Sequence, residues 1–167
     1  MPFKENFQKT THFMILNQKL RTYSNRIPLK KSIQLVVLGL AATFVVAIVG
    51  SLVQSYLGLM DPNIDQTIER INRITIWILL PLILEPIFEE CVFRKLLLTR
   101  CMKRRPTLLS YCIMSLVFAA LHLNWFFFPF FLNSLIYSAI YLKTNRITEA
   151  SIVHILYNFT VLFIAIG

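Results

Sequence analysis

Long apolar blocks alternate with short polar segments along this chain. The blocks cover about residues 33–57, 74–99, 107–123, 126–142 and 148–166. Their lengths match the helix of about 20 residues that is needed to cross a hydrocarbon core about 30 Å thick. The pattern predicts an all-α fold, a polytopic membrane helical bundle of about five transmembrane helices.

A polar arm precedes the first apolar block. We expect residues 1–32 to form a basic cytoplasmic N-terminal arm, with seven Lys or Arg residues and one acid, and residues 33–167 to form one membrane helical domain. Aromatic and basic residues are interleaved irregularly in the arm, which favours either a helix lying on anionic lipid or a partly disordered tail. Membrane lipid is therefore an expected partner.

The composition agrees with a membrane protein and argues against a soluble domain, a nucleic-acid-binding protein and a cysteine-based scaffold. Of the residues, 56% are hydrophobic and 15% are charged, whereas soluble domains are about 45–50% apolar and about 25% charged. The net charge of +9 would suit nucleic-acid binding, but the basic residues flank the apolar blocks, so no nucleic acid is expected as a partner. The three cysteines form no C-x-x-C pair and predict neither a disulfide framework nor a zinc ribbon.

Basic residues concentrate in three of the polar segments. The arm, residues 100–105 and residues 143–146 hold 7, 4 and 2 Lys or Arg residues, and five spans would place all of them on one side. The opposite side would hold two, Arg70 and Arg73. Because Lys and Arg accumulate in cytoplasmic loops, we predict a multi-pass protein of the cell membrane with its N-terminus cytoplasmic and its C-terminus outside.

The second apolar block contains two helix-disturbing residues. Pro81 and Pro86 each remove a backbone donor, so we expect a kink in the helix over residues 74–99. The basic residues 100–105 are expected to form a loop, after which Pro106 suits the first turn of the next helix.

Several polar side chains lie inside the apolar blocks, although an ionisable group there costs on the order of 3 kcal/mol. Residues four apart share one face of a helix, so three helices each present a short polar face. In lipid these faces should point toward one another. The pairs are Glu85 with Glu89, Glu90 with Arg94, Phe118 with His122, and His154 with Asn158.

Most of these residues belong to three short motifs on successive predicted helices. Each motif alone is weak, whereas the three in this order, each inside a predicted span, are fairly specific. The motifs are E-E-x-x-x-R from Glu89 to Arg94, F-x-x-x-H from Phe118 to His122, and H-x-x-x-N from His154 to Asn158.

In this order the motifs resemble the CPBP family, which contains CAAX proteases and bacteriocin-processing enzymes and is also called the Abi family. The resemblance covers about residues 74–160, and it implies a CAAX-protease-like core and an intramembrane protease. The chain departs from the family at two places, because Lys95 and Ser138 stand where members often have Gly. Neither departure touches a polar motif residue.

Peptide hydrolysis needs an activated water, a base, and donors for the oxyanion. Glu89 is the candidate base. Glu90 is expected to be held by Arg94 and to orient the site, although the two acids could exchange roles. The resemblance implies the same roles at these positions.

The other motif residues are candidates for the remaining tasks. His122 is expected to position the water or to carry its proton, and Phe118 to orient the site. His154 and Asn158 share a helix face and are expected to donate hydrogen bonds to the oxyanion. The resemblance again implies these roles.

A metal site is a second interpretation of the same side chains. Glu89, His122 and His154 supply one carboxylate and two imidazoles, a set that suits zinc and leaves a coordination position open. The set lacks the H-E-x-x-H signature of zinc proteases. The sequence thus leaves a glutamic and a metallo-endopeptidase open, with zinc as the candidate cofactor.

Three functions fit these observations. The first is an intramembrane endopeptidase whose partner is a membrane-associated peptide or protein substrate. The second is a bacteriocin self-immunity membrane protein on the same scaffold. The third is a small transporter or scaffold without enzymatic activity, in which the polar faces form a proton or ion path. The motifs favour the first.

Overall fold

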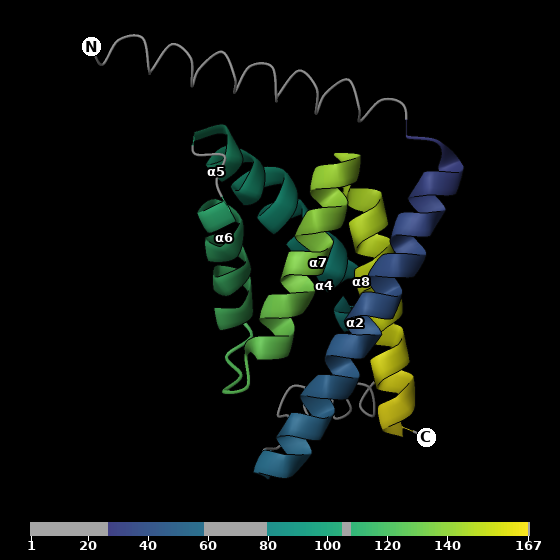
Figure 1. Ribbon diagram of the computed structural model, residues 1–167, viewed down its shortest axis with the longest axis vertical. Coiled ribbons are helices and arrows are strands. Elements are labelled where there is room, and N and C mark those ends of the chain that lie inside the picture. Colours follow the sequence, from purple (N-terminus) through teal and green to yellow (C-terminus); the bar gives the residue numbers. More distant parts are fainter. Residues whose placement is uncertain (1–26, 59–79, 105–107, 167) are drawn as a thin grey trace, which may run out of the picture.

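The computed structural model describes residues 27–58, 80–104 and 108–166 of this chain. All described elements are helices, and no strand occurs in these ranges (Figure 1). The predicted all-α fold class is therefore confirmed. In chain order the elements are α2 (Leu29–Leu57), the π-helical η2 (Leu80–Leu84), α4 (Glu85–Glu90), the π-helical η3 (Cys91–Leu98), α5 (Thr99–Arg104), α6 (Leu108–Ala120), α7 (Phe128–Thr144) and α8 (Ile147–Ile166).

Helix α7 lies at the centre of the bundle, where it contacts α2, α6 and α8 (Figure 1). Helix α4 packs against α8, and η3 contacts α6, α7 and α8. The main core cluster forms where α7 and α8 meet and contains Tyr137, Ile140, Ala150 and Val153. The segments that carry the three motifs are therefore assembled around α7, which carries no motif itself.

Helix α2 packs closely on α7 and α8. A Cβ atom at Gly39 would lie 2.5 Å from Ile140 Cδ1 and 3.3 Å from Val153 Cγ2. Near the start of the helix, the Ser32 hydroxyl donates a hydrogen bond to the Glu149 carboxylate in the interior. Small residues allow close helix approach in membranes, so α2 is an integral part of the bundle.

A Gly39→Leu substitution should destabilise this packing, because the new side chain would overlap Ile140 and Val153. Overpacking a core costs about 1–3 kcal/mol, which corresponds to a fall of about 5 °C in the apparent melting temperature of the purified protein. The matched control is Ala41→Leu, on the exposed face of the same helix, which should melt like the wild type. Equal melting of the two variants would contradict the close packing of α2.

The outside of the bundle is apolar. On α2 alone Val37, Leu38, Val45, Ile48 and Leu52 are exposed, and a large exposed apolar surface marks a membrane or an interface. Two described helices are long and apolar enough to cross a membrane, α2 and the first 18 residues of α8, whereas the apolar α6 is shorter. The number of five spans stays a prediction.

The described basic segments gather at one end of the bundle. The start of α2, helix α5 and the turn between α7 and α8 lie at the same end (Figure 1), and this end carries Lys30, Lys31, Lys143 and Arg146. The arrangement agrees with the charge distribution expected for cytoplasmic loops. Which end faces the cytoplasm stays a prediction.

Several predicted boundaries differ from the structure. Helix α2 begins at Leu29, so the end of the predicted arm is helical. Helix α5 occupies most of the predicted basic loop, and α6 ends at Ala120, three residues before the predicted end. Most of the arm, the turn predicted after residue 57, the start of the second span and the start of the third lie outside the described residues, in 1–26, 59–79 and 105–107.

A tight turn ends α6. The N–H groups of His122 and Leu123 donate to the carbonyls of Ala119 and Ala120 at 3.2 Å, and Leu123 adopts a φ of 51°. A positive φ is uncommon for a residue with a branched side chain, so the sequence did not indicate this stop. As a correction to the predicted span, His122 lies in the turn after α6, but its ring still contacts that of Phe118, with centroids 4.7 Å apart.

The two prolines change the type of helix without ending it. Pro81 lies in η2, Pro86 lies in the first turn of α4, and the helical conformation continues through η3 and α5. In a π-helical turn each carbonyl faces the N–H five residues further on, and for Pro81 that residue is Pro86, which has no N–H. Single π turns in longer helices occur frequently at functional sites.

Candidate active site

Four titratable side chains form a continuous chain in the interior. Arg94 Nε lies 3.1 Å from Glu90 Oε2, Glu90 Oε1 lies 3.2 Å from His154 Nδ1, and His154 Nε2 lies 3.8 Å from Glu89 Oε2. The side chains of Glu90 and Arg94 are 0% and 1% exposed, whereas that of Glu89 is 29% exposed. The chain therefore leads from a fully buried ion pair to a partly accessible carboxylate.

The buried end of this chain is held by helix α7. The Arg94 Nη2 group donates to the Ser134 hydroxyl at 3.1 Å and to the Ser134 carbonyl at 3.3 Å. The guanidinium also lies against aromatic rings, with Cζ 4.7 Å from the centroid of Phe118 and 5.6 Å from that of Tyr137. These contacts hold the Arg94 guanidinium in place, and the guanidinium in turn holds one oxygen of the Glu90 carboxylate in the ion pair.

Phe118 contacts both imidazoles of the site. Its centroid is 4.7 Å from that of His122 and 6.2 Å from that of His154. An edge-to-face contact with Phe93, at 5.1 Å and 83°, holds the ring itself. Phe118 is 2% exposed, so it packs the interior of the site.

The ring of His122 is fixed by its own turn and by a neighbouring helix. Its Nδ1 atom lies 2.9 Å from the Phe118 carbonyl, and its ring lies 4.3 Å from that of Phe130 on α7. A carbonyl oxygen can only accept, so Nδ1 carries the hydrogen in this contact. In the neutral imidazole Nε2 then holds a lone pair and can accept a proton.

Asn158 contacts the backbone of η2. Its amide nitrogen donates to the Pro81 carbonyl at 3.5 Å, a long hydrogen bond. Because Pro86 cannot supply the N–H that this carbonyl faces in a π turn, the amide compensates for it. The contact ties α8 to η2, and η2 leads directly into the helix that carries both acids.

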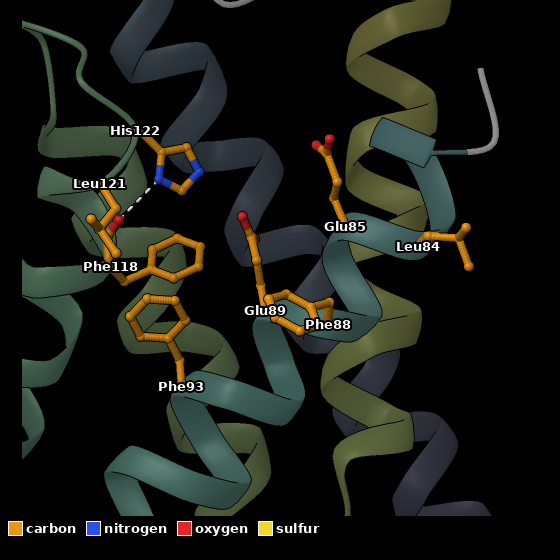
Figure 2. A pocket seen from close by; sticks show the side chains of 8 residues that line it. All are labelled: Leu84, Glu85, Phe88, Glu89, Phe93, Phe118, Leu121 and His122. Atoms are coloured by element: carbon orange, nitrogen blue, oxygen red, sulfur yellow. Dashed lines mark hydrogen bonds between the residues drawn. The ribbon is translucent and has the colours of Figure 1, made fainter. Parts of the chain in front are cut away.

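A pocket of about 420 Å³ opens beside Glu89. Figure 2 shows the carboxylates of Glu85 and Glu89 and the ring of His122 around the same space, with the aromatic rings below them. The pocket therefore combines a partly exposed acid with an imidazole in a largely apolar wall. Its lining residues are Leu84, Glu85, Phe88, Glu89, Phe93, Phe118, Leu121 and His122.

The predicted zinc ligands do not form a metal-binding group. In residues 27–58, 80–104 and 108–166, no three His, Cys, Asp or Glu side chains are arranged so that they could hold a metal ion. The Phe118 ring contacts both His122 and His154. The zinc set of Glu89, His122 and His154 stays a prediction, as does the choice between a glutamic and a metallo-endopeptidase.

The structure brings most of the predicted site residues together. Both acids, Arg94 and His154 form the interior chain, and Phe118 packs against it. His122 and Glu89 line the same pocket. Asn158 follows His154 by one helical turn and contacts η2.

Sequence reasoning missed two residues of α7. Ser134 binds Arg94, and Tyr137 stacks on His154 with ring centroids 4.6 Å apart. Their three-residue spacing puts them on one helix face, but an isolated Ser and Tyr in an apolar block carry no motif. Only the contacts show that this face of α7 borders the site.

The sequence of this chain is similar to those of known membrane proteases. Residues 71–160 match a family model described as type II CAAX prenyl endopeptidase Rce1-like. The chain is also 30% identical over 169 residues to the membrane-embedded CAAX protease MroQ of Staphylococcus aureus (strain USA300), an alignment that covers 92% of this chain and 68% of that protein. No solved structure matches. All three motifs lie within the residues that the family model matches.

Proposed function

This chain belongs to the Rce1-like family of type II CAAX prenyl endopeptidases, and from that premise we propose that it cuts its substrate with a water molecule activated by Glu89. The family establishes a membrane protease. The observation that carries the glutamate mechanism is the chain from Arg94 through Glu90 and His154 to Glu89, which ends at the pocket.

Glu89 is the general base of the proposed reaction. It is the accessible end of the interior chain and lines the pocket, whereas Glu90 is fully buried and held by Arg94. As the oxygen of the water attacks the peptide carbonyl carbon, one proton of the water passes to the Glu89 carboxylate. Glu89 then gives this proton to the leaving nitrogen as the C–N bond breaks.

His154 holds the base in place. Because Glu90 is paired with Arg94, its other carboxylate oxygen accepts the hydrogen on Nδ1 of His154. The opposite nitrogen, Nε2, then faces Glu89 at 3.8 Å. With its hydrogen on Nδ1, the neutral imidazole of His154 holds a lone pair on Nε2, which can accept a hydrogen bond from Glu89 once this carboxyl has taken up the proton of the water. In this tautomer the donor to the oxyanion is Asn158.

His122 faces the attacking water in this proposal. With its hydrogen on Nδ1, the Nε2 lone pair can accept a hydrogen bond from the water and so direct the water oxygen at the carbonyl carbon. Asn158 supports the site from α8, where one of its amide hydrogens binds the Pro81 carbonyl of η2. An amide nitrogen carries two hydrogens, so the same side chain can also serve as a donor to the oxyanion.

The walls of the pocket indicate the kind of substrate. Leu84, Phe88 and Leu121 line the pocket and are exposed, so the substrate meets an apolar rim before it reaches Glu89. We therefore propose a membrane-associated peptide or protein with apolar side chains next to the bond that is cut. We also propose that the basic end of the bundle faces the cytoplasm, as the positive charge there supports.

Comparative membrane proteomics tests the proposed function. Cells that contain the wild-type chain should release a shortened membrane peptide that is absent from cells with Glu89→Ala, at equal protein level. The matched control is Glu149→Gln, which alters a buried acid on α8 that does not line the pocket, and the shortened peptide should persist in it. Identical peptide profiles in wild-type and Glu89→Ala cells would contradict the protease assignment of this pocket.

A further inference from the structure

We propose that Tyr137 is a positioning residue of the reaction, because its ring fixes the plane of the His154 imidazole between the two acids. The inference rests on the proposed function, in which His154 orients Glu89. It adds a residue from α7, the central helix, which none of the three motifs includes.

The contact has the geometry of a stack. The rings of Tyr137 and His154 have centroids 4.6 Å apart and planes inclined by 19°. The Phe118 ring also contacts the His154 imidazole, with centroids 6.2 Å apart and planes inclined by 65°. Tyr137 is 1% exposed, so this arrangement is enclosed in the core.

The orientation of the imidazole decides whether both acids are reached. Nδ1 faces Glu90 at 3.2 Å and Nε2 faces Glu89 at 3.8 Å. The second torsion angle of a histidine side chain has broad minima, and a rotation of the ring about this bond would turn both nitrogens away from the acids. A flat partner such as the Tyr137 ring restricts this rotation.

The same face of α7 holds the other end of the ion pair. Ser134, three residues before Tyr137, accepts a hydrogen bond from Arg94, and the Tyr137 ring lies 5.6 Å from the Arg94 guanidinium carbon. One rigid helix face therefore sets both partners of Glu90. The active arrangement depends on the position of α7 as well as on the three motif segments.

The ring carries this role and the hydroxyl does not. In the described part of the chain the Tyr137 oxygen is buried and has no hydrogen-bond partner. Removal of an unpaired buried polar group is neutral or stabilising. Tyr137→Phe should therefore keep the stack and preserve both stability and activity, whereas Tyr137→Leu removes the flat surface.

The experiment uses the full chain in lipid nanodiscs, with histidines labelled with ¹⁵N. The chain has three histidines, and a His154→Gln sample assigns the signals of His154. In the wild type and in Tyr137→Phe, the ¹⁵N shifts should report one tautomer with its hydrogen on Nδ1. In Tyr137→Leu the two ring nitrogens should move toward averaged shifts.

Activity is measured as cleavage of the full-length membrane peptide that the proteomics experiment identifies as the substrate. Tyr137→Leu should lower kcat by on the order of 100-fold, because small misplacements at a reacting centre cost about this much. KM should change by less than about threefold, since Tyr137 does not line the pocket. Tyr137→Phe should restore kcat.

A second buried tyrosine of α7 provides the matched control. Tyr141 lies one turn further on and contacts Thr99 through its hydroxyl, 2.9 Å away. Tyr141→Leu should lower the melting temperature as much as Tyr137→Leu but leave the His154 shifts and kcat unchanged. Unchanged His154 shifts in Tyr137→Leu would overturn the positioning role. If the wild type cuts no peptide, the proposed function fails, while the ¹⁵N shifts still decide whether Tyr137 holds the imidazole.

Discussion

Glu89→Gln should reduce kcat of the reconstituted protein by about 10²–10⁴-fold, the range that a general base contributes. The substitution keeps the size and shape of the side chain and removes only its ability to take up the proton of the water. KM should stay close to that of the wild type, because the apolar wall of the pocket is unchanged. The measurement is cleavage of the natural peptide by the purified chain in vesicles, followed by mass spectrometry.

The interpretation of this loss depends on intact folding. Glu89 is partly exposed and lies at the end of the interior chain, so Glu89→Gln should melt within about 2 °C of the wild type, as expected for a change of less than about 1 kcal/mol. Retained cleavage by a folded Glu89→Gln variant would exclude Glu89 as the base. Glu90, its neighbour in the sequence, would then be the candidate base.

Arg94→Leu should have the largest effect on stability. It would leave the Glu90 carboxylate, which is 0% exposed, without its ion-pair partner. Removal of one member of a buried pair costs about 3–5 kcal/mol, equivalent to a fall on the order of 10 °C in melting temperature for a chain of this size. Circular dichroism of the purified protein during heating measures the shift.

Two further variants separate charge from packing. Lys95→Leu, one residue along the same segment and exposed, should melt like the wild type. The double variant Glu90→Leu with Arg94→Leu should be more stable than Arg94→Leu alone, because no unpaired charge remains in the interior. If Arg94→Leu melts like the wild type, the ion pair is not a stabilising element of the bundle.

The polar side chains of the site could be predicted because ionisable groups are costly, and therefore rare, inside membrane-spanning helices. Glu90 and Arg94 are four residues apart inside an apolar block, where an ion pair on one helix face is the simplest arrangement. The structure shows this pair at 3.1 Å. His154 could likewise be expected to face the acids, because it has no polar alternative in the hydrocarbon.

Other features left no trace in the sequence. Tyr137 and Ser134 look like ordinary residues of an apolar helix, since their importance lies in contacts across the bundle. Leu123 adopts a positive φ, which is uncommon for leucine, so the sequence gives no sign of a turn at this position. The early end of α6 and the place of His122 in a turn were therefore not predicted. The prolines predicted a disturbance but not the π-helical turns that resulted.

The six-residue α4 lies between two π-helical segments, and this placement limits where residues can be inserted or deleted in the chain. Each residue of an α-helix turns the chain by about 100°. Loss or gain of a single residue in η2 would therefore swing Glu89 and Glu90 toward the lipid while leaving their sequence motif intact. Among relatives, insertions and deletions should thus be tolerated in loops but rejected in the helical turns that precede the acids.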